Sequence, residues 1–174
     1  MADVMIDIEG LGTGPDATIL TIAAVEFDPL RRDDLGRQYY ARVDLESQAD
    51  RRIEQGTLDW WATQPVAIKD DAFSEQDRVS LREALEGLTR MVWHSSRVWA
   101  QGPTYDMTIL EHAYKSLNMA LPWQYYRVRD SRTLFGLAPN LERYPASHNA
   151  LEDCCCQIAL IWDTMEYLKI KELR

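Results

Sequence analysis

The sequence predicts a mixed α/β fold in which three strands come first and helices alternate with strands afterwards. Residues 4–9 alternate between aliphatic side chains at positions 4, 6 and 8 and the side chains of Met5, Asp7 and Glu9, as in a half-buried strand. Residues 17–27 form a long apolar run rich in β-branched side chains, which is typical of a central strand. Residues 149–168 instead repeat apolar side chains at helical spacing. These three observations predict a sheet flanked by helices.

The strands expected in the first part of the chain are consecutive and are joined by short turns. Residues 10–15 contain three glycines and a proline, and Asp28 and Pro29 end the second strand. Because two neighbouring strands with a short connection pair antiparallel, we expect a three-stranded meander. The strands cover residues 4–9, 17–27 and 38–45.

A helical region follows the meander. Thr57 is predicted to cap a short helix that carries Trp60 and Trp61 and ends near Pro65. Residues 98–100 are expected to form a short buried strand, and no repeat or linker divides residues 1–174, so one domain is expected. The other helices are predicted over residues 77–94, 105–118, 131–137 and 149–168.

The composition is that of an acidic globular protein. The chain has 174 residues, 46% of them hydrophobic, and a net charge of −9. These values exclude a disordered or collagen-like chain, and the negative charge argues against a broad basic face that grips duplex nucleic acid. Without a secretory signal or an 18-residue apolar run, the chain is expected to be cytoplasmic and to have no membrane contact.

Three cysteines are adjacent, at Cys154, Cys155 and Cys156. Neighbouring residues on a helix point about 100° apart, so the three thiols cannot converge on one zinc ion. An odd, clustered set is also not a disulfide framework. We expect two of them in the core and one at its edge.

The first strand carries two carboxylates on one face. Asp7 and Glu9 follow Met5 on the side opposite the apolar positions 4, 6 and 8. Two like charges in a buried strand are costly unless something neutralises them, and carboxylate oxygens suit Mg²⁺ or Mn²⁺. The alternative is that the pair lies on a solvated edge.

Two further motifs carry acidic or titratable side chains. Asp106 lies in the first turn of a predicted helix, where an acid also stabilises the helix N-terminus for purely local reasons. His148 and Asp153 can approach each other if His148 lies in the loop before the last helix and Asp153 lies in its second turn. His94 and His112 are interpreted as structural.

The order Asp7-x-Glu9, then Asp106, then His148-x₄-Asp153 is far more specific than any single motif. The set resembles that of the DEDDh 3′–5′ exonucleases, and the resemblance covers nearly the whole chain. It is strongest to ribonuclease T-like enzymes of bacteria and phages, to which residues 58–61, 98–106 and 122–124 are also similar. Two positions depart from the family pattern: Gly10 stands where many relatives have Thr, and Gln101 is the nearest amide before Asp106.

The resemblance implies a ribonuclease H-like fold and a metal-dependent exonuclease. Asp7, Glu9, Asp106 and Asp153 would bind two Mg²⁺ or Mn²⁺ ions, and His148 would act as the general base. The enzyme would act on 3′ ends of single-stranded RNA or DNA, with RNA slightly favoured, and release nucleoside 5′-monophosphates. Relatives are often homodimers, which makes a homodimer an expectation as well.

Substrate contacts are expected from aromatic side chains and from backbone near the first motif, because stacking grips bases without reading sequence. Trp60 and Trp61 are equally well explained as one tryptophan in the core and a second that packs over it. Of the arginine clusters at 31–32, 51–52 and 127–132, the last is the best candidate for a phosphate contact. The candidate substrate residues are Gly10, Leu11, Trp60, Trp61, Tyr105 and Met107.

Two other classes of function stay open on the sequence alone. A catalytically inert binding module on the same fold would tolerate loss of a metal ligand, so the intact set of five motif residues argues against it. An acidic protein that mimics DNA would suit the net charge, but it predicts carboxylates spread over an exposed face rather than pairs within apolar strands.

Overall fold

The computed structural model describes residues 2–173 and builds them around a six-stranded sheet with the order β4-β3-β2-β1-β5-β6. The first three strands form the expected antiparallel meander, β5 and β6 continue the sheet in parallel with β1, and β4 lies parallel to β3. The expectation of a mixed sheet is therefore confirmed. The strands are β1 (Asp3–Gly10), β2 (Ile19–Phe27), β3 (Leu35–Val43), β4 (Arg78–Val79), β5 (Val98–Ala100) and β6 (Val128–Asp130).

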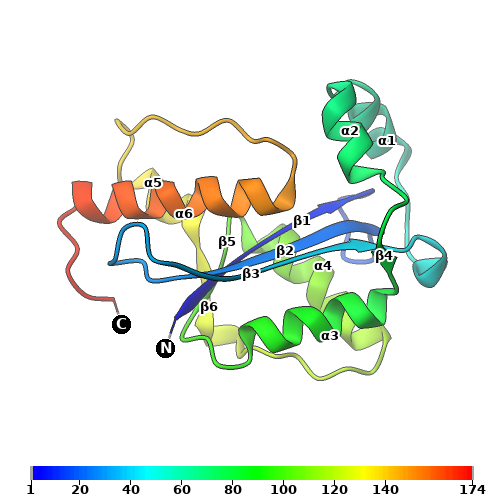
Figure 1. Ribbon diagram of the computed structural model, residues 1–174, viewed down its shortest axis with the longest axis horizontal. Coiled ribbons are helices and arrows are strands. Elements are labelled where there is room, and N and C mark those ends of the chain that lie inside the picture. The colour runs from blue at the N-terminus through cyan, green and yellow to red at the C-terminus, as the bar shows by residue number, and fades with distance from the viewer. Residues whose placement is uncertain (1, 174) are drawn as a thin grey trace.

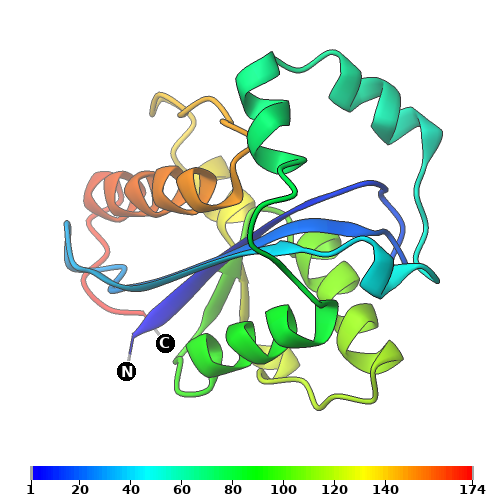
Figure 2. The same ribbon diagram turned by 45° about the vertical axis from the view of Figure 1, so that its right-hand side comes forward.

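Helices cover both faces of this sheet (Figure 1). The helix α6 lies on one face with α5 beside it, and α3 and α4 lie on the other. The pair α1 and α2 stands at the end of the sheet where β1 ends (Figure 2). The helices are α1 (Gln55–Ala62), α2 (Val66–Ala72), α3 (Leu81–Val92), α4 (Pro103–Ser116), α5 (Ser131–Gly136) and α6 (Ala150–Tyr167), with short 3₁₀ turns at Glu46–Gln48 and Tyr125–Arg127.

The central strand β1 is buried on both faces. Val4, Ile6 and Ile8 pack into the core formed with α3 and α4. Met5 packs into a second core formed with α6, where the Cys154 thiol approaches the Met5 carbonyl at 3.8 Å. The side chains that follow Met5 on this face therefore point toward the N-terminal part of α6.

Helix boundaries differ from the sequence expectation where capping decides them. The long helix α3 begins at Leu81 rather than at residue 77, because Ser80 and Glu83 form a capping box. Arg78 and Val79, which precede this Ser80 cap, pair with β3 as strand β4. Helix α1 begins at Gln55 with Glu54 as N-cap, so Thr57 lies inside the helix and does not cap it.

The sequence pattern did not predict α2 or β4, and it left a strand or a turn open where β6 lies. The expectation of two cysteines in the core and one at its edge was wrong, because only Cys154 is buried and both Cys155 and Cys156 are half-buried. All three thiols are free. Between residues 2 and 173, no helix combines the length and the apolar character that crossing a lipid bilayer requires.

Candidate active site

Asp7 and Glu9 come from the end of β1 and lie on its α6 face, with each side chain half-buried. The Asp7 carboxylate accepts a hydrogen bond of 2.8 Å from Gln157 Nε2 on α6. Gln157 follows Asp153 by four residues, so both project from the same side of that helix. This spacing could have identified Gln157 from the sequence.

Asp106 reaches the same strand from its other edge. β5 pairs with β1 only at Val4 and Met5, so the parallel ladder ends before Ile8. The Ile8 N–H instead donates to Asp106 Oδ1 at 3.2 Å, and Asp106 is buried. The early end of β5 thus creates a backbone donor that fixes a carboxylate from the first turn of α4 beside β1.

Asp153 organises the loop before α6. Its Oδ1 accepts hydrogen bonds from Ser147 N at 2.7 Å and Ser147 Oγ at 3.0 Å, and its Oδ2 accepts from His148 N at 3.0 Å. These bonds stabilise His148 in a left-handed backbone conformation with φ of 57°. Asp153 lies in the first turn of α6, one turn earlier than expected.

Asn149 links this loop to the helices at the end of the sheet. Its side-chain oxygen caps α6 by accepting from Leu151 N and Glu152 N at 3.0 and 3.1 Å. Its Nδ2 donates to Asp71 Oδ2 on α2 at 2.6 Å. Asp71 also forms an ion pair with Arg42 of β3. The loop that carries His148 is therefore held from both sides.

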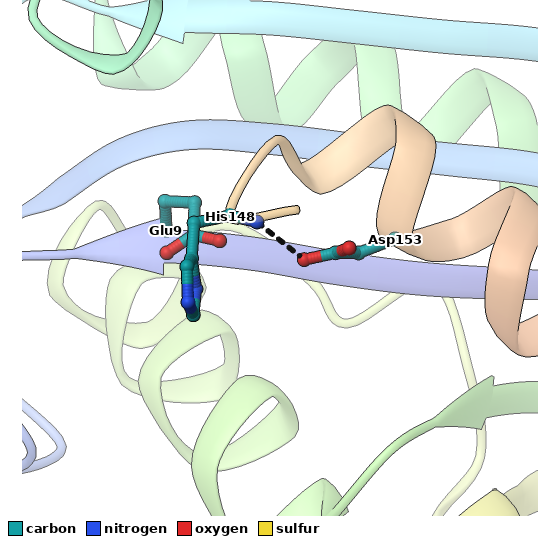
Figure 3. A group of neighbouring side chains, drawn as sticks. All are labelled: Glu9, His148 and Asp153. Atoms are coloured by element: carbon teal, nitrogen blue, oxygen red, sulfur yellow. Dashed lines mark hydrogen bonds between the residues drawn. The ribbon is translucent and has the colours of Figure 1, made fainter. Parts of the chain in front are cut away.

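Side chains far apart in sequence converge at this point. Glu9, His148 and Asp153 each offer one ligand atom, and these atoms lie within 4.8 Å of one another. Figure 3 shows the His148 imidazole beside the Glu9 carboxylate, while Asp153 bonds to the His148 main chain. A cavity of about 220 Å³, here called the carboxylate cavity, is lined by all five motif residues, Asp7, Glu9, Asp106, His148 and Asp153.

Burial and mutual repulsion raise the pKa of three carboxyl groups in this cavity, those of Asp7, Glu9 and Asp106. Burial raises the pKa of Asp7 well above its ordinary value, and the Asp106 charge raises it further. Burial raises the pKa of Asp106 to about 7, and burial followed by the Asp7 charge raises that of Glu9 to about 9. A cation bound among these groups would favour their charged forms and so lower these pKa values.

A second cavity, here called the Trp60 cavity, adjoins the first and shares Glu9 and Tyr105 with it. It measures about 520 Å³ and is also lined by Gly10 and by Trp60, which is 41% exposed. The Trp60 ring meets the His148 ring edge-on, with centroids 4.9 Å apart. Three of the expected substrate residues, Gly10, Trp60 and Tyr105, therefore lie together.

The other three expected substrate residues lie elsewhere. Trp61 is buried and donates from Nε1 to the Gly10 carbonyl at 3.0 Å, which supports the turn after β1. Leu11 and Met107 are buried in the hydrophobic cores and line neither cavity. Both backbone polar groups of Leu11 are also bonded internally, to Thr18 and Glu54.

Comparison with known proteins finds nucleases along nearly the whole chain. Residues 2–165 match the model of the Rv2179c-like 3′–5′ exoribonuclease domain. An exodeoxyribonuclease of enterobacteria phage T4 is 25% identical over 207 residues, covering 96% of this chain and 90% of that protein.

Solved nucleases share the fold. A complex of E. coli ExoI with single-stranded DNA superposes with a TM-score of 0.68 at 12% identity, over 95% of this chain. This chain covers only 43% of that one. The nuclease domain of 3′hExo, a DEDDh family member bound to rAMP, gives 0.60 at 16% identity over 99% of this chain and 94% of its own. These likenesses establish the ribonuclease H-like fold.

The match to the family model spans nearly the whole chain, and the order of acidic and histidine residues that resembled the DEDDh enzymes is brought together around one cavity. The chain belongs to the Rv2179c-like 3′–5′ exoribonuclease domain family and is a 3′–5′ exonuclease of the DEDDh type.

Proposed function

We propose that this exonuclease removes nucleotides from the 3′ end of single-stranded nucleic acid with the help of two Mg²⁺ or Mn²⁺ ions. The observation that carries the proposal is the convergence on one cavity of four carboxylates from β1, α4 and α6. The residues Asp7, Glu9, Asp106 and Asp153 would hold the ions.

The donor set fits such ions. Carboxylate oxygens are the hard ligands that both metals prefer. Within residues 2–173, none of these four carboxylates forms an ion pair, within 4.0 Å, with the side chain of a lysine, arginine or histidine. The raised pKa values of Asp7, Glu9 and Asp106 come first from burial and then from the repulsion between neighbouring carboxylates, and a bound cation would oppose both effects.

The chemistry follows from what each residue does. When bound, two such ions activate a water and stabilise the charge on phosphorus and on the leaving oxygen. A ring nitrogen of His148 accepts the proton of the attacking water. The water oxygen bonds to phosphorus, the bond from phosphorus to the 3′ oxygen of the upstream nucleotide breaks, and that oxygen takes a proton. The products are a nucleoside 5′-monophosphate and a chain shorter by one nucleotide.

The Trp60 cavity suits the terminal nucleoside. Trp60 and Tyr105 offer aromatic surface for a base, which grips any sequence. A side chain at Gly10 would place its Cβ 3.0 Å from the Thr18 carbonyl and 3.2 Å from the Tyr105 hydroxyl, so glycine keeps this wall open.

We propose RNA as the preferred substrate and DNA as the alternative. The description of the family supports RNA, whereas the phage T4 relative is an exodeoxyribonuclease. A homodimer stays a prediction from the resemblance, which analytical ultracentrifugation tests.

The test uses matched 5′-labelled single-stranded RNA, single-stranded DNA and duplex DNA, incubated with Mg²⁺, Mn²⁺ or EDTA. We expect stepwise shortening from the 3′ end of single strands, faster for RNA, and none in EDTA. Asp106→Ala should abolish shortening and weaken Mn²⁺ binding in calorimetry, whereas Asp70→Ala, which removes an exposed acid, should change neither.

Three outcomes would overturn parts of this proposal. Absence of metal binding would remove the mechanism. Binding of strands without cleavage would support an inert module. Cleavage of a strand with a 3′-phosphate at the normal rate would contradict attack at a free 3′ end.

A further inference from the structure

The carboxylate cavity holds all four carboxylates, the Trp60 cavity shares only Glu9 of them, and the two cavities differ in their cationic side chains. Among residues 2–173, Arg132 is the one lysine or arginine that lines either of them, and it lies in the carboxylate cavity. The Trp60 cavity has no cationic side chain in its lining. A nucleic acid that occupies both cavities would therefore meet protein positive charge on one side only.

Hydrogen bonds hold both the backbone and the side chain of Arg132. The Arg132 backbone N–H donates to Asp130 Oδ1 at 3.0 Å, and the same oxygen accepts from Gly102 N at 3.3 Å. The guanidinium donates from one nitrogen to the Gln101 carbonyl at 3.2 Å. The turn after β5 and the start of α5 are thus tied together around this arginine.

Gly102 makes room for the guanidinium. Its φ of 95° lies in the left-handed region, and an added Cβ would lie 3.2 Å from the central guanidinium carbon. Arg132 makes no ion pair with a carboxylate within 4.0 Å in the part of the chain that the structure describes. The remaining donors and the charge are available to a ligand in the cavity.

The neighbouring arginines are used differently. Arg127 donates to the Ser95 carbonyl, and Arg129 donates to the carbonyls of Tyr126 and Val128. Neither of them lines the carboxylate cavity or the Trp60 cavity. The structure therefore separates Arg132 from a cluster whose members look equivalent in sequence.

We propose that Arg132 binds the phosphate immediately upstream of the scissile one, an inference that rests on the proposed function. With the terminal nucleoside in the Trp60 cavity and the scissile phosphate at the carboxylates, the chain continues into the carboxylate cavity. The Arg132 charge lowers the pKa of Asp106, so the guanidinium lies near the carboxylates, yet it forms no ion pair within 4.0 Å with a carboxylate of residues 2–173. A phosphate that follows the scissile one along the strand would pass this position. A guanidinium matches two phosphate oxygens at once.

This contact sets a minimum substrate. A dinucleotide with a 5′-hydroxyl has one phosphodiester and no upstream phosphate. The same dinucleotide with a 5′-phosphate has the upstream phosphate, and the two substrates are otherwise identical. Since a hydrogen-bonded charge contact contributes about tenfold to a hundredfold in kcat/KM, the 5′-phosphorylated dinucleotide should be preferred by at least about tenfold.

The experiment measures kcat/KM for both dinucleotides with the wild type, Arg132→Ala, Arg132→Lys and Arg129→Ala. We expect Arg132→Ala to reduce the preference to within about threefold of unity, and Arg132→Lys to restore part of it. Arg129→Ala removes the same charge from the same cluster and should keep the wild-type preference. Circular dichroism confirms that each variant is folded.

Each contrary result has its own meaning. A wild-type enzyme without preference, or an Arg132→Ala variant that keeps it, would overturn the inference while leaving the proposed function intact. An equal loss for both dinucleotides would place Arg132 at the scissile phosphate and overturn the assignment. Failure of the wild type to shorten any strand would overturn the proposed function itself, and the inference with it.

Discussion

Replacing Glu9 with glutamine should stabilise the metal-free protein at alkaline pH while abolishing its activity. Glutamine keeps the size of the side chain and removes its charge. Burial and the Asp7 charge raise the pKa of Glu9 from 4.5 to about 9 in the folded protein. Between these two values the native state holds a proton that the unfolded state has lost, so the free energy of unfolding falls as pH rises.

The magnitude follows from this window. One pKa unit corresponds to about 1.4 kcal/mol, so Glu9 alone should lower the free energy of unfolding by about 4 kcal/mol between about pH 5.5 and about pH 8.5. Glu9→Gln should therefore show a much flatter dependence of stability on pH.

The assay is urea unfolding in EDTA across this pH range, with midpoints and m-values compared between variants. Glu26→Gln is a matched control, because its ion pair with Arg37 lowers the pKa of Glu26. That carboxyl is ionised in both states over the range, so the control should lose stability by a constant amount. If the pH dependence of Glu9→Gln runs parallel to that of the wild type, the reasoning about burial at Glu9 is wrong.

Four further outcomes are expected. His148→Ala should keep metal binding and lower turnover by at least about a hundredfold, measured in single-turnover assays. Asp3→Ala should destabilise the protein by about 3–5 kcal/mol in urea unfolding, because buried Asp3 pairs with Arg97. Asp71→Ala should lower kcat roughly tenfold with little change in KM, since Asp71 supports the His148 loop through Asn149. Binding of single strands should weaken only slightly with salt, with a slope of about −0.7 for each phosphate contacted.

Each of these has a contrary result. Near-normal turnover of His148→Ala would remove its role as base, and an unchanged urea midpoint for Asp3→Ala would show that the pair is not needed. A rise in KM alone for Asp71→Ala would indicate a substrate contact rather than positioning of the loop. A salt slope typical of many phosphates would show binding along an extended strand.

The convergence of the five motif residues on one cavity could be predicted from the sequence because it depends on residue types in a fixed order. Asp7 and Glu9 share a face through the two-residue period of a strand, which survives any error in the ends of that strand. Asp106 follows a short buried strand, and Asn149 is a strong N-cap before the last helix. These are local features, and the structure agrees with them.

What the sequence could not predict depends on contacts between distant segments. The Ile8 N–H can donate to Asp106 only because β5 stops pairing with β1 before Ile8. The bond from Asn149 to Asp71 requires α2, which a short segment after Pro65 did not reveal.

The net charge of −9 is compatible with a nucleic-acid substrate for the same structural reason. The acids that matter are concentrated in one cavity, where divalent cations would convert them from a repulsive cluster into a binding site for a phosphate. Among residues 2–173, Arg132 is the one lysine or arginine that lines either cavity, and it lies in the cavity that holds these acids. With ions bound, such an enzyme would hold a 3′ end through a few local contacts, and repulsion from its other acidic groups would favour release of the shortened strand.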